Sequence, residues 1–159
     1  MHIREMLSED SGFVEEVLRN AWGSTQVVSR GVIHQADDLP AIVALSSKQE
    51  KIGLLTYAIK ESNLEIVTLN SLKQGEGIGT ALIQKAEEIA VSEGCIRIWV
   101  ITTNDNRDAI EFYQKRGFQI RAIHKNAIEH SRKLKPEIPL IGLNGIPIRD
   151  EIELEKLIS

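Results

Sequence analysis

The sequence predicts a mixed α/β domain of ordinary size. The chain has 159 residues, the length of one typical domain, so we expect a single domain spanning residues 1–159. Short segments of strand length recur along it, and longer segments place apolar residues at helical spacing. Turns rich in Gly, Asn and Ser separate these segments. Hydrophobic residues make up 42% of the chain, which is enough to build a core.

Apolar or alternating runs bounded by turns predict the strands. They cover residues 2–6, 41–45, 52–59, 64–69, 96–101, 118–123 and 152–157. The run over 96–101 is almost wholly apolar, which is typical of a central strand covered on both faces. In 64–69, simple alternation places Leu64, Ile66 and Thr68 on one face. The opposite face then takes Glu65, Val67 and Leu69.

Apolar residues at helical spacing predict helices over 13–22, 78–90, 106–116 and 127–134. Gly23, Gly94 and Gly117 stand where the first three of these helices would end. Asn106 stands where the third begins, a position at which asparagine commonly caps a helix. The segment 24–40 is compatible with strand or helix pieces, and the segment 139–147 predicts a loop.

Charge and cysteine content narrow the classes of function. The chain has 19 Lys and Arg against 23 Asp and Glu, a formal net charge of −4. This balance argues against general affinity for nucleic acid and suits a cationic amine as substrate. No apolar run approaches the length of a membrane span, and no apolar leader follows Met1. Cys95 is the one cysteine, so no internal disulfide can form and we expect a cytoplasmic location.

The run from Gln74 to Gly79, Gln-Gly-Glu-Gly-Ile-Gly, predicts a phosphate-binding loop. Three glycines at alternate positions let the backbone turn sharply and approach a ligand closely. The loop leads into a predicted helix, whose first amides lack internal partners and favour negative charge. It is not a Walker loop, because Thr80 stands where that loop needs a lysine. It matches the dinucleotide fingerprint weakly, because three predicted strands follow the first helix before the loop.

Two motifs together resemble the GNAT superfamily of N-acetyltransferases. Gln74–Gly79 fits the pattern Gln-x-x-Gly-x-Gly, and Asn106–Phe118 fits the later pattern Asn-x-x-Ala-x-x-x-Tyr-x-x-x-Gly-Phe. One predicted helix and one predicted buried strand lie between them, as in that superfamily. The resemblance covers residues 1 to about 125 and implies a mixed, mostly antiparallel sheet of six or seven strands flanked by helices. It also implies that the fourth and fifth strands splay apart, and that residues 124–147 are a subfamily-specific insertion.

The resemblance implies acetyl transfer from acetyl-CoA to an amine, by direct attack in a ternary complex and without a metal. It assigns the general acid to Tyr113, whose phenol is suited to protonating the departing thiolate. Glu65 is the candidate general base, because some family members place a glutamate at the position of Asn63, two residues earlier on the same face. His34 and His124 are alternative bases. The residues implied to bind acetyl-CoA are Val67, Leu69, Gln74, Gly75, Glu76, Gly77, Ile78, Gly79, Thr80 and Asn106.

The acceptor amine stays open between a small molecule and a peptide. We expect the segments 23–40 and 124–147 to build the acceptor cleft, because loops in this superfamily vary there. Edge strands pair in some members of the superfamily, which leaves a homodimer as an alternative to a monomer. The competing hypothesis is a non-catalytic acyl-CoA-binding module on the same fold. Retention of Tyr113 and Glu65 favours the enzyme.

Overall fold

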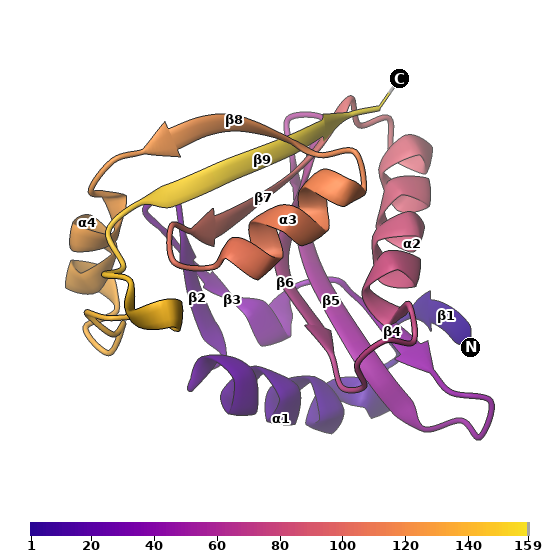
Figure 1. Ribbon diagram of the computed structural model, residues 1–159. Helices are drawn as coiled ribbons and strands as arrows, with labels where there is room; N and C mark the ends of the chain where they lie inside the picture. The colour runs from indigo at the N-terminus through magenta and orange to yellow at the C-terminus, as the bar shows by residue number, and fades with distance from the viewer. Residues whose placement is uncertain (159) are drawn as a thin grey trace.

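The computed structural model describes residues 1–158, and within that range the chain forms nine strands and four α-helices (Figure 1). The helices are α1 Ser11–Trp22, α2 Ile78–Ser92, α3 Arg107–Lys115 and α4 Ala127–Leu134. The strands are β1 His2–Glu5, β2 Gln26–Ser29, β3 Val32–Gln35, β4 Ala41–Leu45, β5 Lys51–Lys60, β6 Asn63–Ser71, β7 Arg97–Thr103, β8 Gln119–His124 and β9 Glu151–Leu157. Short 3₁₀ helices cover Ser8–Asp10, Ala36–Asp38 and Leu143–Gly145. No helix in the described range is both long and apolar enough to span a membrane.

Seven of the strands form one sheet in the order β1-β4-β5-β6-β7-β9-β8. The neighbours β6 and β7 run parallel, and the other five pairs are antiparallel. The sheet is therefore mixed and mostly antiparallel, as the sequence resemblance implied. The segment 24–40 contributes a separate antiparallel hairpin of β2 and β3. Arg30 and Gly31 make its tight turn, and both have positive φ, which suits a two-residue hairpin loop.

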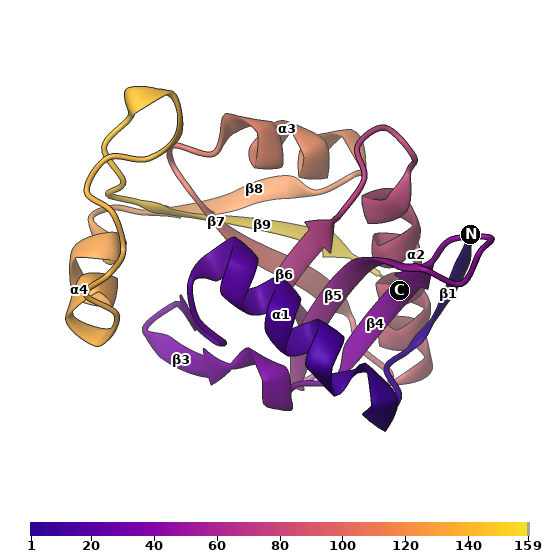
Figure 2. The same cartoon turned by 90° about the horizontal axis from the view of Figure 1, so that it is seen from below.

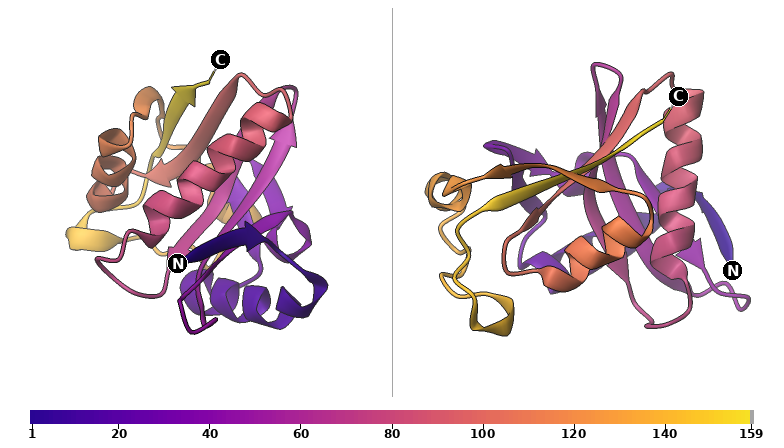
Figure 3. Two further views of the ribbon diagram at one scale, coloured as in Figure 1. Left: turned by 90° about the vertical axis from the view of Figure 1, so that its right-hand side faces the viewer. Right: turned by 45° about the horizontal axis from the view of Figure 1, so that its top comes forward.

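Helices cover both faces of the sheet. On one face, Ile78 and Leu82 of α2 and Tyr113 of α3 belong to the main hydrophobic core (Figure 3). On the other face α1 lies across β4, β5 and β6, and Val14 and Leu18 join a second cluster there (Figure 2). The β2–β3 hairpin contacts α4, and both lie at one end of the molecule (Figure 1). The segments whose secondary structure was hardest to predict from the sequence therefore lie close together.

The strands β6 and β7 pair over a short distance and then separate. Their register runs from Asn63 opposite Arg97 to Ile66 opposite Val100, and ends there although both strands continue. This is the separation that the resemblance implied between the fourth and fifth predicted strands. Beyond Ile66, the edge of β6 that faces β7 has no neighbouring strand. Its backbone groups are therefore free to pair with an extended ligand.

A β-bulge at Val67 makes the alternation of side chains along β6 differ from the predicted one. Thr56 of β5 pairs with Thr68, whereas the next residue, Tyr57, pairs with Ile66, so Val67 has no partner on β5. One extra residue reverses which side chains face the helices. Leu69 consequently packs against the same core as Ile66, and the prediction that it shares a face with Glu65 is wrong.

The expectation that 96–101 is covered on both faces is only partly correct. The strand begins at Arg97, and Ile96 is 63% exposed. Ile98 and Val100 are buried in the core beneath the helices, whereas Trp99 faces the opposite side and is only half-buried. On that side Arg97 stacks over the Trp99 ring and pairs with Glu153 and Glu155 of β9. On this face ion pairs lie where the apolar run predicted apolar cover.

A buried carboxylate just before α1 ties this part of the chain to β1 and β5. The Asp10 side chain is fully buried and accepts hydrogen bonds from Arg4 at 2.7 Å and from the Leu7 amide at 2.8 Å. Lys51 of β5 lies 2.8 Å away from it. These partners, the Arg4 hydrogen bond foremost, hold the pKa of the Asp10 carboxyl far below its usual range. Its stabilising effect is therefore complete above the unfolded-state pKa of about 3.9 and is lost as the pH falls toward the folded-state pKa.

Asp10→Asn should lower the free energy of unfolding by about 2 kcal/mol near neutral pH, because charge-assisted bonds to Arg4 and Lys51 are lost. The difference from wild type should shrink as the pH falls below about 4, where protonation weakens the same bonds in wild type. Urea denaturation at neutral and acid pH measures both effects. Glu9→Gln, which neutralises an exposed neighbouring carboxylate, is the control. Equal stabilities of wild type and Asp10→Asn at neutral pH would contradict the prediction.

Candidate active site

A cavity of about 620 Å³ opens where β6 and β7 separate. Ile66 and Val67 of β6, the segment 101–103 of β7 and Asn106 at the start of α3 form one side of it. The segments 21–29 and 128–139 supply most of the other side. Parts of the segments 23–40 and 124–147 line this cavity, and that it is the acceptor cleft stays a prediction.

Glu65 supplies a buried carboxylate to this cavity. Its residue is 7% exposed, and it lies on β6 just before the point where β6 and β7 separate. The Ser29 hydroxyl on β2 donates a hydrogen bond to Glu65 Oε2 at 2.6 Å. His34 Nε2 on β3 lies 3.5 Å from Glu65 Oε1. The β2–β3 hairpin therefore orients the carboxylate and brings one of the two alternative bases beside it.

The loop before α2 has the open geometry of an anion-binding turn. Gly75 and Gly77 have φ values of 74° and 72°, and a Cβ at either would meet no atom within 4 Å. Gly77 is the N-terminal cap residue of α2, so the amides of the first turn begin directly after it. The residues from Gln74 to Gly77 are all exposed. These glycines are required by backbone conformation rather than by crowding.

The third glycine of the loop motif has a different structural reason. A Cβ on Gly79 would lie 2.9 Å from Cζ of Phe112, so this position lets α2 approach α3 closely. Thr80 follows it and accepts a hydrogen bond from Arg116 Nε at 2.7 Å. The Arg116 guanidinium also stacks 3.6 Å above the Phe112 ring. It brings a positive charge to the first turn of α2, a feature that sequence reasoning missed because Arg116 is at a variable position of the later motif.

Tyr113 and Asn106 lie on the same helix in different surroundings. Asn106 caps α3 by accepting a hydrogen bond from the Ala109 amide at 3.1 Å, and it lines the cavity. Tyr113 is 6% exposed, with its ring in edge contact with Phe112 and Phe118, and it does not line the cavity. Burial raises the pKa of the Tyr113 phenol well above its usual value. The phenol therefore keeps its proton throughout the neutral range.

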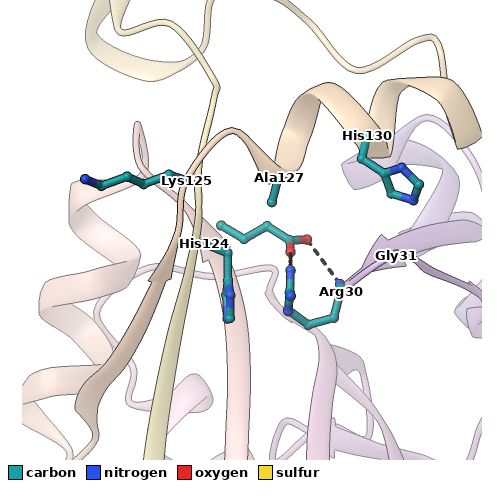
Figure 4. A pocket seen from close by; sticks show the side chains of 7 residues that line it. Arg30, Gly31, His124, Lys125, Ala127 and His130 are labelled. Atoms are coloured by element: carbon teal, nitrogen blue, oxygen red, sulfur yellow. Dashed lines mark hydrogen bonds and ion pairs between the residues drawn. The ribbon is translucent and has the colours of Figure 1, made fainter.

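A second, smaller cavity of about 440 Å³ lies beside the first (Figure 4). Arg30, His124 and His130 line it, and Glu151 lines both cavities. Arg30 Nη1 donates to Glu151 Oε1 at 2.7 Å, so this ion pair lies between the two spaces. His124, the other alternative base, is 2.9 Å from Glu153 and belongs to this second cavity rather than to the surroundings of Glu65.

Cys95 lies outside both cavities. It is 6% exposed within the core that α2 covers, and burial raises the pKa of its thiol. A thiol in such surroundings is a poor nucleophile. Cys95 is therefore a packing residue of the core rather than part of the candidate site.

Comparison with known proteins identifies the family. The model of the acetyltransferase (GNAT) family matches residues 9–118, more than two thirds of the chain. The chain belongs to the GNAT acetyltransferase family. It is an acyltransferase, and the matched segment contains the glycine loop, both strands that separate and the whole of α3.

Relatives of this GNAT acetyltransferase occur in several bacteria. The uncharacterized protein YdhI of Bacillus subtilis is 47% identical over 138 residues, covering 87% of this chain and 86% of YdhI. Among solved structures, an IAA acetyltransferase from Bacillus cereus has a TM-score of 0.77 at 25% identity, with 99% of each chain covered. A Bacillus subtilis acetyltransferase in complex with CoA has a TM-score of 0.71 at 20% identity, again with 99% of each chain covered. The arrangement of strands and helices is therefore that of GNAT enzymes throughout.

Proposed function

We propose that this protein transfers the acetyl group of acetyl-CoA to a primary amine by direct attack in a ternary complex. The observation that supports this most is the position of Glu65, a buried carboxylate in the cavity that opens at the separation of β6 and β7. One space thus combines an open strand edge for the donor with a group able to accept a proton from the acceptor. Acetyl-CoA as the cosubstrate is in keeping with the CoA-bound Bacillus subtilis relative.

The glycine loop is suited to the pyrophosphate of acetyl-CoA. The backbone amides after Gly77 and the positive end of the α2 dipole favour binding of a negatively charged group. Arg116, fixed by Thr80 and stacked on Phe112, adds a cation beside them. In this proposal Gln74 and Glu76, which stand next to the glycines, line the same pyrophosphate-binding site.

The free edge of β6 is suited to the extended arm of the donor. Val67 and Leu69 lie beyond the last residue that pairs with β7, so their backbone groups can bond a ligand as a strand would. The bulge at Val67 turns the local backbone away from regular pairing with β5, which frees it to face the thioester oxygen. Asn106 lies across the cavity with its side-chain amide group available to the same arm.

The proposed reaction uses two side chains. Glu65 removes a proton from the bound ammonium, directly or through water, because the acceptor must be neutral to attack. The neutral nitrogen then forms a bond to the acetyl carbon, and the carbon–sulfur bond breaks. The nitrogen gives up its second proton as the amide forms, and that proton replaces, directly or through water, the one that Tyr113 donates. Tyr113 donates its proton to the departing sulfur, which leaves as the thiol of CoA. The donor must reach toward α3 for this step, because Tyr113 does not line the cavity itself.

An assay of thiol release with a broad panel of amines tests the function. Free CoA should appear only when both acetyl-CoA and a suitable amine are present, and mass spectrometry should detect the acetylated amine. Tight binding of acetyl-CoA by calorimetry, without thiol release for any amine, would instead favour a non-catalytic acyl-CoA-binding module.

Gly77→Glu should weaken the affinity for acetyl-CoA by at least about tenfold, because it adds a negative charge and a strained φ at the loop. Gly94→Glu is a matched control. Gly94 has a φ of 75° and equally open surroundings, but it lies beyond the opposite end of α2. Calorimetric titration with acetyl-CoA measures both variants. Equal affinities would show that the loop does not bind the donor.

A further inference from the structure

We infer that the acceptor is a monocationic amine attached to a compact apolar body, alkyl or aryl. This inference rests on the proposed acetyltransferase function and names its substrate class. It follows from which groups in the cavity wall are free to bind an acceptor and which are already occupied. The wall that concerns the acceptor is the one built by the segments 21–29 and 128–139.

Most polar side chains of the cavity wall already have partners within the protein. Ser29 donates to Glu65, and the Ser131 hydroxyl donates to the Ala127 carbonyl at 3.2 Å. The Thr103 hydroxyl donates to Asp105. A substrate with many hydroxyl groups or amides would find few free partners here, and each of its own buried polar groups would then be unsatisfied.

The remaining wall is apolar. Its acceptor side consists of side chains from α1, β2, α4 and the loop that follows α4, namely Trp22, Val27, Val28, Ile128, Ile138 and Pro139. Side chains of this kind bind alkyl and aryl groups by excluding water from both surfaces. Glu65 lies in the same space as these residues. An amine whose nitrogen meets Glu65 therefore places its carbon skeleton against an apolar surface.

Charges around the cavity disfavour a second ammonium group. Glu151 is buried but already paired with Arg30, at 2.7 Å. Lys135 also lines the cavity, where its ammonium donates to the Gln26 carbonyl at 2.8 Å. Glu137 also lines the cavity, but it is exposed, so solvent and salt screen its charge. Glu65 is thus the buried carboxylate of this wall that has no cationic Arg or Lys partner.

The second cavity likewise disfavours an acceptor with further ammonium groups. Figure 4 shows the side chains of Arg30, His124 and His130 around one space, with Lys125 turned away from them. A long polycation that extended past Glu151 would find Glu151 already paired with Arg30 and no other carboxylate among the residues that line this second cavity. We therefore expect polyamines and aminoglycosides to be poor acceptors.

Hydrogen bonds from Lys135 and Arg132 hold the apolar wall in place, which helps it to select among acceptors. Lys135 bonds the carbonyls of Trp22 and Gln26, which ties the end of α4 to the loop between α1 and β2. Arg132 donates to the carbonyls of Pro139 and Ile148 at 2.7 and 2.8 Å. A preorganised apolar wall discriminates better than one that must form on binding.

Three amines of equal chain length test the inference with wild-type enzyme. Hexylamine, aminohexanol and hexamethylenediamine differ only at the end remote from the reacting nitrogen. Their kcat/KM values should fall in that order, with hexylamine at least about 100-fold above the diamine. A short peptide with a free N-terminus, spermidine and an aminoglycoside complete the panel and should all react more slowly than hexylamine.

A matched pair of variants assigns the preference to the wall. Ile138→Thr places a hydroxyl in the cavity and should lower kcat/KM for hexylamine about tenfold while leaving that for aminohexanol within about twofold. Ile141→Thr makes the same change in the same loop at a residue that is 56% exposed and outside the cavity, and should change neither. Thermal unfolding and acetyl-CoA affinity serve as checks that both variants are folded.

The outcomes separate the two levels of proposal. The expected order of amines, together with selective loss in Ile138→Thr, would support the inference. Turnover that is as fast with the diamine, the aminoglycoside or the peptide as with hexylamine would overturn the inference and leave the acetyltransferase function standing. Binding of acetyl-CoA without turnover of any amine in the panel would overturn the proposed function and the inference with it.

Discussion

Tyr113→Phe should lower kcat by about 10²–10⁴-fold, the range typical of losing a general acid, with acetyl-CoA affinity within about twofold of wild type. The aromatic ring would remain in edge contact with Phe112 and Phe118, so the packing that it provides would persist. The variant removes one hydroxyl group and its proton. Steady-state kinetics with a saturating amine, paired with calorimetry for acetyl-CoA, separates the chemical step from donor binding.

Tyr57→Phe is the matched control for this experiment. Tyr57 is 5% exposed in the same hydrophobic core, and burial also raises the pKa of its phenol. Loss of its hydroxyl should leave kcat nearly unchanged. If Tyr113→Phe were as active as Tyr57→Phe, another group or water would have to protonate the thiolate.

Burial of Tyr113 also affects the pH profile. Because its pKa is raised above the ordinary value of about 10, the proton-donating form persists through the alkaline range of an assay. We therefore expect no loss of kcat from Tyr113 ionisation between neutral pH and about pH 10.

The family and the backbone geometry of the glycine loop could be predicted because short motifs fix them. The positive φ of Gly75 and Gly77 and the cap at Asn106 are local properties of a few consecutive residues. Such properties follow from residue type alone. The same reasoning misjudged Gly79, which serves the approach of Phe112 from a distant helix.

The surroundings of Glu65 could not be predicted in the same way. Ser29 lies 36 residues before Glu65, in a hairpin whose strands have four residues each. Strands so short give little periodic signal, and the pair Arg30-Gly31 is only a weak sequence signal for a turn. The bulge at Val67 was equally hidden, because it arises from how β6 pairs with β5 rather than from the composition of either strand.

Glu65→Gln should lower kcat/KM for the amine by about 10²–10³-fold near neutral pH. The amide has nearly the shape of the carboxylate and can still accept a hydrogen bond from Ser29, so the change is mainly chemical. A glutamine side chain neither accepts the proton of the ammonium nor offers it a counter-charge. Thiol release at subsaturating amine measures the loss.

The pH dependence distinguishes a base from a binding group. If Glu65 removes the proton, the deficit of Glu65→Gln should shrink as the pH approaches the amine pKa of about 10, where free amine becomes abundant. If Glu65 only binds the ammonium, KM should rise without a fall in kcat at saturating amine. Glu153→Gln is the control, since Glu153 is a half-buried carboxylate of β9 that pairs with Arg97 and lies outside the main cavity.

The roles of Ser29 and His34 can be tested separately. Ser29→Ala removes the hydroxyl that orients Glu65 and should lower kcat by about tenfold at most, with an unchanged pH profile, because the carboxylate itself remains. His34→Gln should leave the profile unchanged if Glu65 is the base, although the two side chains are 3.5 Å apart. A profile that loses its acid limb in His34→Gln but keeps it in Glu65→Gln would transfer the role of base to the histidine, and the glutamate would then be the group that positions it.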